Sequence, residues 1–197
     1  MKKHLSLILL ASLLYACTVS ESNDCDCNDL IQEEGIWMKE PGKPYTGYCE
    51  AFYSNGNKEG SSQFVDGKMN GHVKFYYQSG KIKEDLEHKD NEKTGKVIYY
   101  YESGQIEIEG YVKNGNRIGE WTEYYKDGTV SVINEYESNV AHGSYKSFFK
   151  NGSIEMEGQV LHGKELGKWL FYDTLGVNEA YWIYDEGEPI EQVWLGK

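Results

Sequence analysis

Residues 95–115 read Gly95-Lys-Val-Ile-Tyr-Tyr-Tyr-Glu-Ser-Gly104-Gln-Ile-Glu-Ile-Glu-Gly110-Tyr-Val-Lys-Asn-Gly115, and this spacing of glycines returns every 24 residues. One glycine series opens each copy, a second follows nine residues later, and a third position holds only Gly or Asn, the residues that most easily adopt positive φ. Six copies without an insertion indicate a stacked repeat, and we expect each series to mark a turn of the backbone. The three series are Gly47, Gly71, Gly95, Gly119, Gly143 and Gly167; Gly56, Gly80, Gly104, Gly128, Gly152 and Gly176; and Gly67, Asn91, Gly115, Asn139, Gly163 and Gly187.

An aromatic and β-branched run precedes each second-series glycine, as in Lys96-Val-Ile-Tyr-Tyr-Tyr101, and such runs favour strands. Dipeptides such as Asn55-Gly56 and Asp127-Gly128 favour two-residue hairpin loops of type I′. With such a loop, an aromatic residue would face a β-branched one in four hairpins, each pair contributing about 0.2–1 kcal/mol. One face of the sheet would then be apolar, and the other would mix aromatic and charged residues. The expected apolar pairs are Tyr77 with Ile82, Tyr101 with Ile106, Tyr125 with Val130 and Phe149 with Ile154; those on the mixed face are Tyr76 with Lys83, Tyr100 with Glu107 and Phe148 with Glu155.

The sequence therefore predicts an all-β fold, an elongated, twisted antiparallel sheet built from six 24-residue β-hairpin repeats over residues 47–187. With about thirteen strands at about 4.8 Å each, the sheet would extend about 60 Å. Residues 35–46 are expected to add an N-terminal capping strand. After Gly187 the repeat pattern breaks, so residues 188–197, which include Pro189, are expected to form a C-terminal cap.

The N-terminus carries a targeting signal. Residues 1–16 combine a basic start with an apolar stretch too short to span a bilayer, which is typical of a signal peptide. Leu14-Tyr15-Ala16-Cys17 resembles the bacterial lipobox, which implies that Cys17 is diacylated and becomes the mature N-terminus; the alternative is a secretory peptide cut near Ala16. Thr18 stands where an inner-membrane retention signal commonly shows Asp, which favours the outer membrane or the cell surface. Residues 17–34 are polar and acidic and are predicted to be a tether.

Three cysteines remain after Cys17, namely Cys25, Cys27 and Cys49. In an oxidising compartment one member of the close pair could bridge to Cys49, leaving one thiol over. A Cys-x-Cys metal site is the alternative, but no second cysteine pair or histidine lies near it. We predict no metal and no cofactor.

The chain is acidic, with 20 Lys plus Arg against 32 Asp plus Glu and a net charge of −12. Removing residues 1–16 discards Lys2 and Lys3 and no acid, so the mature charge is 18 − 32 = −14. Nucleic acids and anionic lipids are bound by neutralising phosphates with Lys and Arg, so neither is expected as the main partner. The charge favours a basic protein partner, or simply solubility.

The pattern Gly-x-x-x-x-Tyr-Tyr-x-x-Gly, followed by x-Ile/Val and Gly-x-x-x-Gly, resembles the variant MORN repeat over about residues 45–187. It is similar to bacterial proteins often labelled YwqK-family antitoxins. The resemblance implies a membrane-proximal, lipid-associated or protein-binding scaffold. The Lys and Arg of a phosphoinositide-binding version are missing, and an export signal conflicts with a cytoplasmic antitoxin. An immunity-type protein that meets its toxin in the envelope remains compatible with both departures.

A candidate binding face is the aromatic ladder on the charged side of the sheet, consisting of Phe52, Tyr76, Tyr100, Tyr124, Phe148 and Tyr172. The ladder could stiffen the sheet by stacking between repeats, or bind a protein or a sugar. Acidic residues recur along the second strand of each hairpin and are interpreted as a solvated face, although paired carboxylates could act as acid and base or bind Ca²⁺. The histidines lack a constant position in the repeat and are interpreted as surface residues. These two sets are Glu59, Asp85, Glu87, Glu107, Glu109, Glu135, Glu155, Glu157 and Glu179; and His72, His88, His142 and His162.

No nucleophile elbow, P-loop or His-Glu-x-x-His motif occurs in the sequence, and the repeats leave little chain for a catalytic domain. We therefore predict a non-catalytic envelope lipoprotein that binds or scaffolds a protein partner, attached to the membrane only through its lipid anchor. The alternative is a glycan-binding module that uses the aromatic ladder.

Overall fold

The computed structural model describes residues 24–196. Its elements are β1 (Asp24–Asp26), η1 (Cys27–Asp29), β2 (Ile31–Glu33), β3 (Ile36–Glu40), β4 (Lys43–Pro44), β5 (Gly47–Phe52), β6 (Lys58–Val65), β7 (Lys68–Tyr76), β8 (Ile82–Lys89), β9 (Glu92–Tyr100), β10 (Ile106–Lys113), β11 (Asn116–Tyr124), β12 (Val130–Glu137), β13 (Val140–Phe148), β14 (Ile154–Leu161), β15 (Lys164–Tyr172), β16 (Asn178–Asp185) and β17 (Glu188–Trp194).

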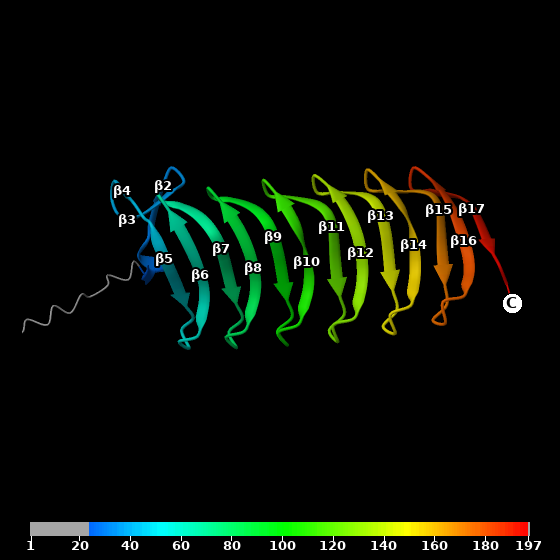
Figure 1. Cartoon of the computed structure of the whole chain (residues 1–197), viewed down its shortest axis with the longest axis horizontal. Coiled ribbons are helices and arrows are strands. Elements are labelled where there is room, and N and C mark those ends of the chain that lie inside the picture. Colours follow the sequence, from blue (N-terminus) through cyan, green and yellow to red (C-terminus); the bar gives the residue numbers. More distant parts are fainter. Residues whose placement is uncertain (1–23, 197) are drawn as a thin grey trace, which may run out of the picture.

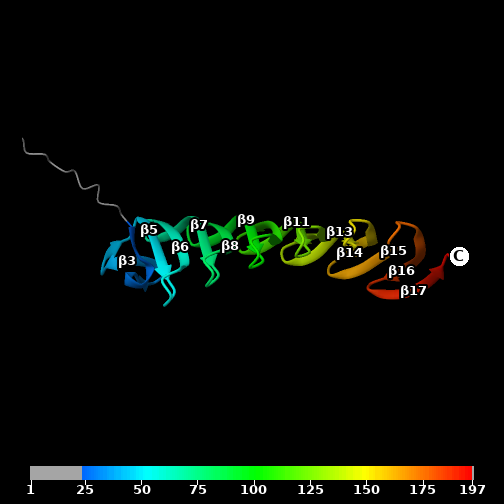
Figure 2. The ribbon, with the colours of Figure 1, turned by 90° about the horizontal axis from the view of Figure 1, so that it is seen from below.

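Fourteen strands form one sheet in the order β1-β5-β6 and then, without a crossover, through β17. The hairpins stand side by side along the long axis of the molecule, with its described ends at opposite ends of the array (Figure 1). The sheet twists along its length (Figure 2). The predicted all-β fold of stacked hairpins is confirmed, with one addition: β1 pairs with β5 in parallel, whereas the strands from β5 to β17 are antiparallel.

Tight two-residue turns connect one repeat to the next. In Asp66-Gly67 the φ angles are 50° and 75°, and in Ser138-Asn139 they are 50° and 70°. Positive φ at both central residues is what a type I′ turn requires, and this turn matches the twist of the strands that it joins. The third glycine and asparagine series therefore adopts the positive φ expected from its composition.

The loops at the opposite end of each hairpin differ from the two-residue prediction. Gly80 N donates to Tyr77 O and Tyr77 N donates to Lys81 O, both at 2.8 Å, so that three residues form the loop, with Gly80 at φ 84°. This is a type I turn closed by a glycine bulge. The extra loop residue shifts the pairing, so Tyr76, rather than Tyr77, faces Ile82. The other three predicted apolar pairs were also wrong by one residue, because the residue before the predicted one faces the β-branched partner. The observed pairs are Tyr100 with Ile106, Tyr124 with Val130 and Phe148 with Ile154.

The first glycine series does not mark turns, contrary to our expectation. These glycines lie within strands, and Gly95 and Gly143 have φ angles of 90° and 122° there. A Cβ at either position would lie within about 2 Å of a carboxylate oxygen of Glu87 or Glu135 on the neighbouring strand. The absence of a side chain lets each carboxylate fold over the backbone, where Glu135 accepts a 3.1 Å hydrogen bond from the amide of Ser144.

The core runs along one side of the sheet, here called the cluster face, which carries Val73, Leu86, Val97, Trp121 and Trp169. All five are at most 4% exposed. Leu86 pairs with Val73 and Val97 across neighbouring strands, so each hairpin buries its apolar residues against the next one. The burial is worth about 1.5–3 kcal/mol for each large apolar side chain. The buried residues are therefore not Tyr77 and Ile82, the pair that we expected on the apolar face.

Glycines on the second strands make room for tryptophans on this face. The indole of Trp121 lies 2.3 Å from where a Cβ of Gly110 would be, and that of Trp169 lies 2.2 Å from the corresponding point of Gly158. Because interiors are close-packed, small and large residues must alternate between neighbouring strands. The missing side chains of Gly110 and Gly158 therefore make room for the two indoles on the cluster face.

The N-terminal part is more structured than a tether. Residues 24–33, which we expected to be extended and solvated, form β1, η1 and β2. Strands β2, β3 and β4 form a separate small sheet beside the tight turns of the first repeats (Figure 1). There Trp37 N donates to Gly67 O at 2.7 Å, and Asn91 Nδ2 donates to Gly35 O at 2.7 Å. The segment thus packs against the repeat array.

At the other end, β17 lies within residues 188–197, the predicted C-terminal cap. No helix within residues 24–196 is long and apolar enough to cross a bilayer.

Candidate binding surface

The aromatic ladder lies where the first strand of each hairpin meets its loop. Phe52 is 48% exposed, whereas the other five ladder residues are half-buried. The ladder lies on the side of the sheet that also carries Lys96 and Glu109. These two residues and the ladder residue Tyr124 are called the triad below, and this side of the sheet is called the triad face. The structure thus places the predicted ladder among charged residues, and the hydroxyl groups of Tyr124 and Tyr172 donate to carboxylates.

Three side chains from three adjacent strands meet on the triad face. Glu109 Oε2 accepts from Lys96 Nζ at 2.9 Å, and Glu109 Oε1 accepts from the Tyr124 hydroxyl at 2.7 Å. Two repeats later, Glu157 contacts Lys146 at 3.2 Å and accepts from the Tyr172 hydroxyl at 2.8 Å. Most carboxylates of this face are therefore already neutralised by a lysine or bonded to a tyrosine.

Burial and hydrogen bonds within the triad determine the pKa values of Glu109 and Tyr124. Hydrogen bonds from Lys96 and then from Tyr124 lower the pKa of Glu109. Burial, followed by the Glu109 hydrogen bond, raises the pKa of Tyr124 to about 12. Burial and the hydrogen bond to Glu157 likewise raise the pKa of Tyr172. At neutral pH Glu109 is therefore charged, and Tyr124 and Tyr172 are neutral hydrogen-bond donors.

Two open hollows of the triad face occupy equivalent positions two repeats apart. The first, of about 380 Å³, is lined by Lys96, Glu109, Gly110, Tyr111, Glu120 and Thr122. The second, of about 490 Å³, is lined by the corresponding Ser144, Glu157, Gly158, Gln159, Lys168 and Leu170, together with Tyr145 and Lys146. Tyr111 is 53% exposed, so the first hollow has an accessible ring at its border. Hydrogen-bonding groups beside an exposed ring suit a polar ligand.

A second set of tyrosines joins the repeats, a role that we did not predict from the sequence. These cross-repeat tyrosines are Tyr53, Tyr77, Tyr101 and Tyr125, and each hydroxyl donates to the carbonyl of a ladder residue in the next repeat, at 2.6–2.7 Å. The signal was present in the constant spacing of 24 residues, but residue type alone does not say which of two adjacent tyrosines reaches across. Phe149 follows in the series and has no hydroxyl.

A row of four carboxylates follows the cross-repeat tyrosines. This acid strip consists of Glu84, Glu107, Glu123 and Glu155. Glu84 pairs across the sheet with Phe75 and Tyr99, which places it on the cluster side. Consecutive members of the strip lie near the same tyrosine. Burial is the largest cause that raises the pKa of each of these tyrosines, and the neighbouring carboxylates raise it further. The carboxylates are Glu107 and Glu84 for Tyr77, Glu107 and Glu123 for Tyr101, and Glu123 and Glu155 for Tyr145.

The acid strip is poorly compensated. Lys83 Nζ is 3.6 Å from Glu84, and Ser147 Oγ donates to Glu155 at 3.1 Å. Glu107 and Glu123 form no ion pair within residues 24–196. The strip therefore concentrates negative charge beside apolar and aromatic side chains such as Phe75, which is 42% exposed.

The predicted acid series does not converge on one point. Asp85 pairs with Lys74 at 3.1 Å and His72 at 2.7 Å, whereas Glu87 accepts from the amide of Lys96 at 3.1 Å. Across the part of the chain that the structure describes, no three His, Cys, Asp or Glu side chains gather as a metal site.

The histidines are likewise separate from one another, with one exception. His142 and His162 pack edge to face with ring centroids 5.1 Å apart beside two consecutive tight turns, and His142 Nδ1 lies 3.7 Å from Glu137. Burial lowers the pKa of His88. No histidine is placed between an acid and a nucleophilic side chain among these contacts.

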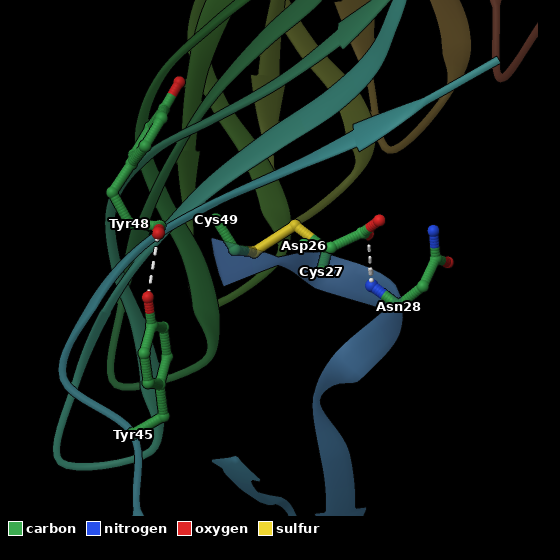
Figure 3. Close-up of a disulfide and its surroundings, with 6 residues drawn as sticks. All are labelled: Asp26, Cys27, Asn28, Tyr45, Tyr48 and Cys49. Carbon is green, nitrogen blue, oxygen red and sulfur yellow. Dashed lines mark hydrogen bonds between the residues drawn. A yellow bond between two sulfur atoms is a disulfide. The ribbon is translucent and has the colours of Figure 1, made fainter. Parts of the chain in front are cut away.

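The cysteine alternatives are resolved in favour of a bridge. Cys27 forms a disulfide with Cys49, with a Cα–Cα distance of 5.0 Å (Figure 3). Cys25 is the free cysteine of the described chain. A Cys25-x-Cys27 metal site is therefore wrong, because a disulfide sulfur is not a thiolate ligand. The signal peptide and Cys17 lie outside the described residues.

The sequence profile described as the MORN repeat variant matches residues 69–90, 93–114, 117–138 and 141–162. Each match covers nearly one whole hairpin, from the start of its first strand to the tight turn. No curated protein matches the chain in sequence. The MORN repeat is a non-catalytic type of module that generally binds proteins or membranes. The four consecutive matches lie within residues 69–162, and together with the uninterrupted series of hairpins they support a MORN-repeat architecture for this part of the chain.

Proposed function

We propose that this protein is a non-catalytic scaffold of the cell envelope that binds a cationic protein partner along its acid strip. Diacylated Cys17 would hold it at the outer membrane or the cell surface. An immunity-type role, in which the partner is a toxin met in the envelope, is the specific form of this proposal that the YwqK-like resemblance favours.

The observation that carries the proposal is the distribution of unpaired charge. On the triad face Glu109 pairs with Lys96 and Glu157 with Lys146, whereas Glu107 and Glu123 have no basic partner within residues 24–196. Lysine and arginine side chains can lay their apolar stems on aromatic rings while their charged ends meet carboxylates. The strip and its neighbouring tyrosines offer both kinds of contact to a basic segment.

The test compares the Glu107→Lys/Glu123→Lys variant with the matched control Glu92→Lys/Glu188→Lys, which changes the net charge equally at exposed sites off the strip. Each full chain is immobilised, envelope proteins are captured, and any retained protein is purified and its affinity measured. We expect at least about a tenfold loss for the strip variant and little change for the control. Raising the ionic strength from about 0.1 M to about 1 M should release the partner. Equal affinities for the two variants would refute the acid strip as the contact.

The second candidate function is glycan binding, and the specific observation that favours it is the pair of equivalent hollows on the triad face. Stacking on Tyr111 and hydrogen bonding to Glu120 would depend little on salt. Tyr111→Ala would weaken an oligosaccharide bound there and would leave a partner of the acid strip unaffected.

A further inference from the structure

Three cysteines meet where the N-terminal segment joins the sheet. Cys27 is bonded to Cys49 of β5, and the same Cys49 is the direct partner of Cys25 in the parallel β1–β5 pairing. Figure 3 shows the disulfide between β5 and the residues that follow β1. Cys49 thus has two cysteine neighbours, two residues apart in the sequence, of which only one is bonded to it.

The backbone geometry suits either bond. Residues directly opposite each other on adjacent strands project to the same side of the sheet, and neighbouring strands lie about 4.8 Å apart. Disulfides form over Cα–Cα distances of about 4.4–6.8 Å, so the strand spacing at Cys25 and Cys49 falls within the required range. The existing Cys27–Cys49 distance of 5.0 Å falls within it as well.

Burial restricts which thiol can reach the bridge. Cys49 is 0% exposed and belongs to a cluster with Leu30, Tyr45 and Phe64, against which both Cys25 and Cys27 pack. A thiol from solution is excluded from the Cys49 sulfur, because disulfide exchange requires direct access to the sulfur under attack. Cys25 is half-buried, and its side chain already packs against this cluster.

We propose that Cys25, Cys27 and Cys49 form an intramolecular thiol–disulfide exchange site. The Cys25 thiolate attacks Cys49 Sγ, a Cys25–Cys49 bond forms, the Cys27–Cys49 bond breaks, and Cys27 leaves as a thiolate. The number of thiols and disulfides is unchanged, so no oxidant or reductant is consumed. Reversal of the same step restores the first bond.

The exchange gives the N-terminal segment two alternative covalent states, each with one disulfide to Cys49. In the described state, the bond pins η1 to the sheet, and Asp26 caps this turn by accepting from Asn28 N at 2.9 Å. In the other state the bond moves to β1 and frees η1 together with the Cys27 thiol. The N-terminal segment stays covalently attached to the array in both states, while the position of the reactive thiol changes.

The first arm of the test uses the full chain as purified without reductant. The protein is incubated between pH 7 and pH 9, trapped with N-ethylmaleimide, digested and analysed by site-resolved mass spectrometry. We expect label on both Cys25 and Cys27. Label on Cys27 should appear faster at higher pH, by up to about tenfold per pH unit, because the thiolate is the attacking species. Label confined to Cys25 at every pH and time would overturn the proposal.

The second arm uses cysteine variants. Cys27→Ser should form the Cys25–Cys49 bond, Cys25→Ser should keep the Cys27–Cys49 bond, and the double variant should have no bond to Cys49. Two free thiols at positions 25 and 49 in a folded Cys27→Ser protein would also refute the exchange site. Should Cys27→Ser fail to fold, the labelling of the unmodified chain still decides the question.

Discussion

The phenol of Tyr124 donates a 2.7 Å hydrogen bond to Oε1 of Glu109 on the preceding hairpin. Because Lys96 contacts the other oxygen of the same carboxylate, one acid links β9, β10 and β11. An equivalent link joins Lys146, Glu157 and Tyr172 two repeats later, so two of the ladder tyrosines also connect repeats.

The first prediction concerns the titration of the triad. Burial and Glu109 raise the pKa of Tyr124 from 10.0 to about 12, so neutral Tyr124 stabilises the fold below pH 10 and this contribution is lost as the pH rises through about 12. The lowered pKa of Glu109 has the opposite sign: its contribution is present at neutral pH and is lost as the pH falls through that lowered value. Tyrosinate absorbance of the Glu109→Gln variant should show a lower Tyr124 pKa that remains above 10.0, because burial is the larger cause.

The control for this titration is Tyr124→Phe, which should remove the group that titrates near pH 12. An unchanged high-pH titration in this variant would assign the shifted group to another tyrosine.

The second prediction concerns the cross-repeat tyrosines. Tyr101→Phe removes the 2.7 Å bond to the carbonyl of Tyr124, and the free energy of unfolding should fall by about 0.5–1.5 kcal/mol. Phe149→Tyr should add the missing member of the series and stabilise by up to a similar amount. The matched control is Tyr111→Phe, an exposed tyrosine whose loss of a hydroxyl should change stability by less than about 0.5 kcal/mol. Urea unfolding measures all three, and equal effects of Tyr101→Phe and Tyr111→Phe would contradict the assigned role.

The third prediction concerns the glycines beneath the tryptophans. A Cβ at Gly110 would lie 2.3 Å from the Trp121 indole, so Gly110→Ala should destabilise by about 1–3 kcal/mol and change the tryptophan fluorescence. At Gly60 a Cβ would meet its nearest neighbour, the Lys74 carbonyl oxygen, at an ordinary 3.5 Å. Gly60→Ala therefore serves as a matched control that should retain full stability. A Gly110→Ala protein as stable as this control would show that the indole moves away without cost.

The fourth prediction concerns the tight turns. Asn139 has a φ of 70°, and its Oδ1 accepts from Arg117 N at 2.7 Å. Asn139 Nδ2 also donates to Asn116 Oδ1 at 2.6 Å. Asn139→Ala should cost about 1–2 kcal/mol for the left-handed backbone in addition to the two lost hydrogen bonds. Asn139→Gly keeps the backbone conformation and should lose only these two bonds, about 0.5–1.5 kcal/mol each. Hydrogen exchange at the Arg117 amide should accelerate in both variants, and equal stability of the two would contradict the backbone argument.

The local sequence does not specify how many residues form the loop of each hairpin. Asp127-Gly128 fits a two-residue type I′ loop, and it equally fits a three-residue loop in which glycine forms the final bulge. In the structure Asp127 Oδ1 accepts from Thr129 N at 3.0 Å, which supports the three-residue form. This one-residue difference moves the pairing with Val130 from Tyr125 to Tyr124. The ladder nevertheless lies on the side of the sheet that carries Lys96 and Glu109, whereas the cross-repeat role of the neighbouring tyrosines was missed.

The sequence by itself determined the repeat, the strands and the positive φ of positions such as Gly115 and Asn139, because these features depend on the steric limits of single residues. Only the tertiary structure decided the facing pairs, the uncompensated charge at Glu107 and Glu123, and the choice of Cys27 over Cys25 as the partner of Cys49. These depend on register and on the packing of one strand against another. Both are set by the whole array, and no single repeat contains enough information to specify them.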